Sequence, residues 1–106
     1  MQYTVLDTSL DVLIKALCAD YKRREALLLS ANPSSRVQNE FRYLNFKIRD
    51  AICEVVGERL CDEFLTDIGG RVGYARTPIC CLAEGTYKSY KSEAKANIAK
   101  KLYLLG

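Results

Sequence analysis

Apolar residues recur every three or four positions along most of this chain, and this spacing constrains the fold more than any other feature. Between residues 9 and 29 the recurring residues are Leu10, Leu13, Ile14, Leu17, Tyr21 and Leu28. Between residues 33 and 56 they are Val37, Phe41, Leu44, Ile48, Ala51, Ile52 and Val55. Charged residues fill many of the positions between them. The pattern predicts two long amphipathic helices packed antiparallel as a helical hairpin.

Short interruptions predict where these helices end. Asparagine before Pro33 disfavours helix, so residues 30–35 form the hairpin loop. Gly57 interrupts the second stripe, and a third helix then follows until Gly69 and Gly70. The basic run of residues 22–24 is flanked by Asp20 and Glu25, which predicts a solvated turn of the first helix rather than a binding site.

The last third of the chain reads as a turn followed by a basic helix. Gly85 permits a tight turn, and Thr86 can cap the amides of the helix that it starts. The helical stripe that follows consists of Tyr87, Tyr90, Ala94, Ile98, Leu102 and Leu105. Lys88, Lys91 and Lys95 share another face, where they can meet phosphate and base edges. The alternative is a solvated lysine face on an ordinary core helix.

Length and charge suggest one domain with a basic end. A chain of 106 residues is expected to form a single helical domain, in which residues 1–69 supply the hairpin and third helix. Residues 1–69 contain nine Lys/Arg and eleven Asp/Glu, so 9 − 11 = −2, whereas residues 70–106 contain seven Lys/Arg and two Glu, so 7 − 2 = +5. A polyanion would therefore be attracted to the C-terminal part.

The composition argues against catalysis and bound metal. Histidine is absent, which excludes a Ser/His/Asp triad and histidine-ligated metals. Glu58, Asp62 and Glu63 have ordinary surface spacing, and the five cysteines lack a C-x-x-C pair. We expect reduced, mostly buried thiols, no cofactor, and a non-enzymatic protein. Without an apolar run of bilayer length or a signal-peptide pattern, we also expect no membrane association and a cytoplasmic location.

A short C-terminal string resembles a known DNA-binding module. The run Glu84-Gly85-Thr86-Tyr87-Lys88-Ser89, with Glu93-Ala94 and residues 98–102, resembles the second half of the helix-turn-helix of sigma-factor region four, as found in phage-encoded transcriptional regulators. The resemblance covers about residues 74–104. Pro78 stands where the positioning helix of that family continues, so either that helix begins at Pro78 and is short or the motif has been remodelled.

The resemblance implies a recognition helix that begins near Thr86 and enters the major groove. Ser89 and Ser92 would face DNA together with Lys88 and Lys91. The implied DNA-binding residues are Arg71, Arg76, Thr86, Lys88, Ser89, Lys91, Ser92 and Lys95.

The sequence therefore predicts an all-α fold, a small helical bundle with a long helical hairpin and a C-terminal helix-turn-helix-like element. The leading hypothesis is a small regulator, of phage or mobile-element type, that docks its basic C-terminal helix on duplex DNA. The alternative is a helical protein-interaction module, such as an adaptor or an inhibitor of a nucleic-acid enzyme, with tyrosines as anchors. The tyrosines available as anchors are Tyr3, Tyr43, Tyr74, Tyr87, Tyr90 and Tyr103. Under either hypothesis the apolar end at residues 102–105 favours a homodimer.

Overall fold

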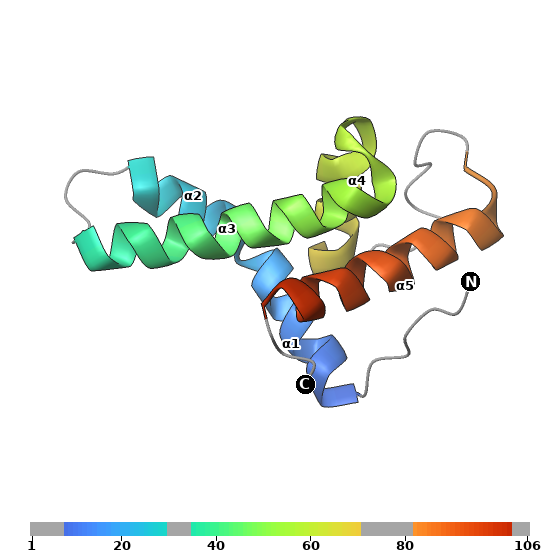
Figure 1. Cartoon of the computed structure of the whole chain (residues 1–106), viewed down its shortest axis with the longest axis horizontal. Helices are drawn as coiled ribbons and strands as arrows, with labels where there is room; N and C mark the ends of the chain where they lie inside the picture. Colours follow the sequence, from blue (N-terminus) through green and yellow to red (C-terminus); the bar gives the residue numbers. More distant parts are fainter. Residues whose placement is uncertain (1–7, 30–34, 71–81, 103–106) are drawn as a thin grey trace.

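The protein is a small all-α bundle, which confirms the predicted fold class (Figure 1). The computed structural model describes residues 8–29, 35–70 and 82–102. These residues contain five helices and no strand. The helices are α1 (Thr8–Ala19), α2 (Tyr21–Leu29), α3 (Ser35–Val56), α4 (Glu58–Gly70) and α5 (Glu84–Lys101).

Gly57 separates α3 from α4, as the sequence predicted. Its φ is 85°, a left-handed conformation in which glycine avoids the steric cost of a Cβ atom. Its amide donates to the carbonyl of Cys53 at 2.9 Å, and Leu60 donates to the Gly57 carbonyl at 3.3 Å. The chain thereby leaves α3 and re-enters a helix without an intervening loop, and α4 extends to Gly70, the last described residue of this stretch.

The first helix is broken, so the prediction of one helix over residues 9–29 is wrong. Asp20 lies between α1 and α2, which take different directions in Figure 1. Of these two helices, α2 lies along α3, while α1 packs against α4 and α5. The hairpin is therefore shorter on one side than the periodicity suggested. Spacing alone missed the break because the apolar stripe continues across it.

Arg24 stabilises this break from the inside. Its guanidinium donates to the Leu17 carbonyl and to Asn45 Oδ1, both at 2.6 Å, and to Asp20 Oδ2 at 3.2 Å. Asn45 in turn donates to the Tyr21 carbonyl at 3.3 Å. Arg24 is buried, so the prediction that the whole basic run of residues 22–24 is solvated is wrong for Arg24, although Lys22 and Arg23 are exposed.

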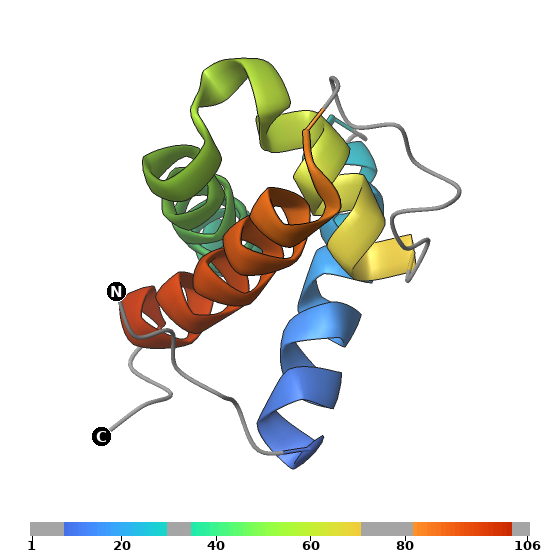
Figure 2. The same cartoon turned by 90° about the vertical axis from the view of Figure 1, so that its right-hand side faces the viewer.

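All five helices contribute to one hydrophobic core. Its fully buried members include Ile14, Ile48, Phe64, Ile68 and Ile98. Helix α5 packs mainly against α3 and also against α1 and α4, so it lies among the other helices rather than at the edge of the bundle (Figure 2). None of the described helices combines the length and apolarity that a bilayer crossing requires.

Candidate interaction surfaces

Helix α5 begins earlier than predicted, and Thr86 does not cap it. The helix starts at Glu84, and its N-cap is Ala83, which makes no side-chain cap hydrogen bond. Thr86 therefore lies inside the first turn, where its side chain is exposed. The buried stripe of α5 is confirmed at Tyr87, Ala94 and Ile98.

Lys91 is held inside the bundle by a buried carboxylate. Its Nζ lies 3.2 Å from Asp67 Oδ2 and 3.3 Å from the Tyr87 hydroxyl, and its side chain is 17 % exposed. The Tyr87 hydroxyl donates to Asp67, whose side chain is completely buried. Burial, reinforced by the hydrogen bond to Asp67, raises the pKa of Tyr87 well above its ordinary value. These three residues form a polar cluster between α4 and α5.

Lys95 makes a second tie, from α5 to α1. Its Nζ lies 2.9 Å from Asp11 Oδ1, and Lys15 approaches the other carboxylate oxygen at 3.0 Å. Burial on its own raises the pKa of Asp11, but the hydrogen bonds from Lys95 and Lys15 outweigh burial and hold it below its ordinary value. Lys95 is only 17 % exposed.

The expectation that the α5 lysines project freely is therefore wrong for Lys91 and Lys95. The reason is that each ammonium compensates a carboxylate contributed by another helix. Lys88 differs, because its side chain is 69 % exposed and lies 3.7 Å from Glu84 on the same helix, a contact of little energetic weight. Ser89 and Ser92 are half-buried.

Several predicted features lie outside the described residues. These are Arg71, Arg76, most of the short helix expected from Pro78, and the apolar end beyond Leu102. The described residues just before α5, Leu82 and Ala83, are not helical. DNA binding through the eight residues implied by the resemblance stays a prediction.

A different surface stands out on α3. Tyr43 is 48 % exposed and Phe46 is 65 % exposed, although both are large aromatic residues on a well-packed bundle. Asn39, Tyr43 and Lys47 are four residues apart, as are Arg42 and Phe46, so the five side chains share one side of the helix. We call these five residues the aromatic face.

The aromatic face is basic and locally ordered. The Lys47 ammonium lies 5.6 Å from the centre of the Tyr43 ring, a cation–π contact that holds the two side chains together. Within the described chain, no carboxylate pairs with Arg42 or Lys47. An open hollow of about 380 Å³ lies beside Tyr43 and is lined by Asn39, Glu40, Tyr43 and Leu44.

The sequence had pointed to Tyr43 but not to Phe46, Arg42 or Lys47. A usable signal existed, because Phe46 falls outside the apolar stripe of Phe41, Leu44 and Ile48. An aromatic residue away from the stripe of an amphipathic helix faces solvent unless another element covers it.

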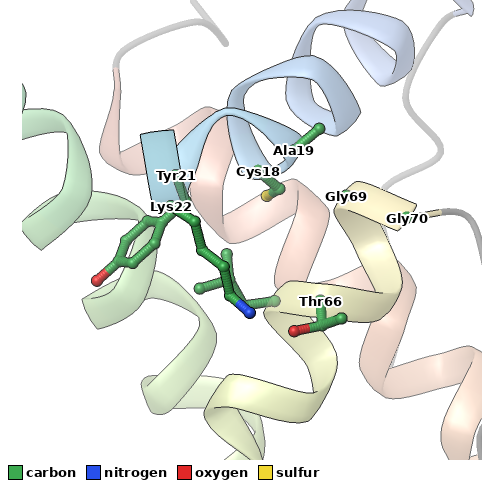
Figure 3. A pocket seen from close by; sticks show the side chains of 8 residues that line it. Cys18, Ala19, Tyr21, Lys22, Thr66, Gly69 and Gly70 are labelled. Carbon is green, nitrogen blue, oxygen red and sulfur yellow. The ribbon is translucent and has the colours of Figure 1, made fainter. Parts of the chain in front are cut away.

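A smaller hollow of about 230 Å³ lies where α1 and α2 approach α4 (Figure 3). Cys18 and Gly69 line it, and Lys22 extends across it toward Thr66. Burial raises the pKa of the Cys18 thiol to about 12, so this thiol is protonated and unreactive at neutral pH. The hollow therefore offers no activated nucleophile.

The described residues contain no group of three or more cysteine or carboxylate side chains placed to hold a metal ion. Cys18, Cys53 and Cys61 are free thiols. No protein-family model, curated protein or solved structure matches this chain significantly.

Proposed function

We propose that the protein is a helical protein-interaction module that acts without catalysis, through the aromatic face of α3. The observation behind this proposal is the contrast between two helices. Lys91 and Lys95 of α5 form ion pairs within the bundle, whereas Tyr43 and Phe46 on α3 are exposed to solvent. Aromatic side chains and arginine, here Tyr43, Phe46 and Arg42, are enriched where proteins bind one another.

The energetics favour this surface as a contact. Burying the exposed part of a phenylalanine side chain contributes on the order of 1–2 kcal/mol. Phe46 and Tyr43 are neighbours on one helix turn, so a partner can cover both at once. Aromatic side chains also lose little conformational entropy on binding, because only two χ angles are fixed.

The polar clusters of the bundle support a structural rather than a chemical role for its buried charges. Arg24 and Asn45 satisfy one another and the carbonyl groups at the helix break. Asp67, Tyr87 and Lys91 likewise bind each other. Groups that are mutually satisfied in this way stabilise one geometry of the bundle.

Site-specific photocrosslinking tests the proposal. A photoreactive phenylalanine analogue replaces Phe46 in cells, and the same analogue at Leu29 provides the control, since Leu29 is 88 % exposed and so more accessible than Phe46. We expect a discrete adduct from position 46 that protease removes and nuclease does not. Adducts of equal yield from both positions, or an adduct sensitive to nuclease, would refute the proposal.

Duplex DNA is a second candidate partner, favoured by the exposed start of α5. Thr86 and Lys88 are both exposed in the first turns, the part of a recognition helix that touches bases. Each phosphate that the protein neutralises should steepen the fall of log K with log salt by about 0.9, and Lys88, whose side chain is 69 % exposed, can supply one such contact. Fluorescence anisotropy with random duplexes measures this slope, and Lys88→Glu should reduce it by about one.

A further inference from the structure

We infer that the aromatic face binds an acidic protein segment that also presents apolar side chains. This inference rests on the proposed function and specifies the chemistry of the partner. The first argument is charge. From residue 35 to residue 47, α3 has Arg36, Arg42 and Lys47 against Glu40, so 3 − 1 = +2. Glu40 is already paired with Arg36 at 3.2 Å, which leaves Arg42 and Lys47 as the cations that a partner meets.

The second argument is the arrangement of polar and apolar groups. Phe46 and Tyr43 adjoin one another, and Arg42 and Lys47 flank them on the same helix. A partner with apolar side chains between carboxylates can therefore cover the two rings while its carboxylates reach the two cations. The hollow beside Tyr43, with Leu44 in its lining, gives one apolar side chain of the partner a place to insert.

The same charges argue against a second copy of this chain. In a two-fold pairing of aromatic faces, Arg42 and Lys47 of both copies would be brought close together. Such like-charge contacts oppose association. A partner of opposite charge is therefore the better match.

The charges further along α3 argue against a nucleic acid on this face. Asp50 and Glu54 follow Lys47 at helical spacing and share a single ammonium, that of Lys101, at 3.3 and 2.5 Å. This end of the helix is thus net negative and would repel a continuous polyanion. A short acidic segment can end before it reaches these carboxylates.

A peptide-display selection tests the inference. A random peptide library is selected against the immobilised full chain, with the Phe46→Ser variant used for counter-selection. We expect the enriched peptides to be acidic and to contain large apolar residues. Their affinities are then measured by fluorescence anisotropy against the wild type and against Phe46→Ser, Lys47→Glu and the matched control Leu29→Ser.

We expect Phe46→Ser to weaken binding at least about tenfold, which corresponds to 1.4 kcal/mol. Lys47→Glu should also weaken binding, and added salt should reduce the difference in affinity between the wild type and Lys47→Glu because it screens the charges. Leu29→Ser should leave affinity unchanged. Circular dichroism melts of each variant verify that the substitutions leave the fold intact.

Two results separate failure of this inference from failure of the proposed function. Basic or neutral peptides, or binders that tolerate Phe46→Ser, overturn the inference while protein binding itself stands. Absence of any enriched peptide, together with no protein adduct from position 46, overturns both. Sedimentation velocity covers the remaining case, because self-association abolished by Phe46→Ser would assign the face to a second copy and contradict the inference.

Discussion

A close approach of α1 and α4 at Gly69 predicts that alanine destabilises the protein there, opposite to its usual effect in a helix. A Cβ atom added at Gly69 would lie 2.7 Å from the Ala19 amide nitrogen and 2.9 Å from both Ala19 Cα and the Cys18 carbonyl carbon. All three are backbone atoms, so no side chain can rotate away. Gly69→Ala would ordinarily gain about 1 kcal/mol from helix propensity. Here the helices must separate by several tenths of an ångström, and overpacking of this kind costs about 1–3 kcal/mol.

The overpacking cost exceeds the propensity gain, so we expect Gly69→Ala to lower the free energy of unfolding by up to about 2 kcal/mol and the melting temperature by up to roughly 10 °C. Urea and thermal unfolding followed by circular dichroism measure both quantities. Gly85→Ala is the matched control, because a Cβ there meets nothing within 4 Å and the substitution should stabilise by up to about 1 kcal/mol. If Gly69→Ala also stabilises the protein, the described crossing of α1 and α4 is wrong.

The other predictions concern the polar ties of the bundle. Arg24→Met leaves the buried Asn45 Oδ1 without its donor and should cost about 3 kcal/mol, whereas adding Asn45→Leu should recover part of that loss in a double-mutant cycle measured in urea. The pKa of Asp11 is lowered in the folded state, so its ionised carboxylate adds to the free energy of unfolding above about pH 4, and this contribution is lost as pH falls through the folded pKa. Urea titrations between pH 3 and 6 should therefore show a shallower dependence of the free energy of unfolding on pH in Lys95→Met than in the wild type. Ala83→Asp supplies the missing N-cap acceptor of α5 and should raise the free energy of unfolding by about 1 kcal/mol in the same assay.

Local signals in the sequence predicted most of the fold. The apolar stripe of α3 and the interruption at Gly57 are properties of a few adjacent residues, and both are found where the sequence placed them. The same holds for Tyr87, Ala94 and Ile98 on α5. Such features depend on periodicity and backbone sterics alone.

The fate of the charged residues was harder to predict, because it depends on elements distant in the chain. Lys95 meets Asp11 across 84 positions, and no spacing rule connects the two. Arg24 did leave a signal, since Leu17, Tyr21, Arg24 and Leu28 are three and four residues apart and place the arginine on the apolar side. The charge of Arg24 indicated an exposed side chain, but the Leu17 carbonyl at the helix break provides it with a hydrogen-bond partner.

The central claim is that Lys91 and Lys95 of α5 stabilise the bundle and do not face a ligand. Replacement of Lys91 tests this claim most directly. The measurement is the free energy of urea unfolding of Lys91→Met, compared with Lys88→Met on the same helix. We expect a loss of about 1–3 kcal/mol for Lys91→Met, which removes the ammonium 3.2 Å from the buried Asp67 carboxylate, and a change within about 0.5 kcal/mol for Lys88→Met. Equal, negligible changes in the free energy of unfolding of both variants would contradict the claim and would indicate that Lys91 is exposed, as the sequence had suggested.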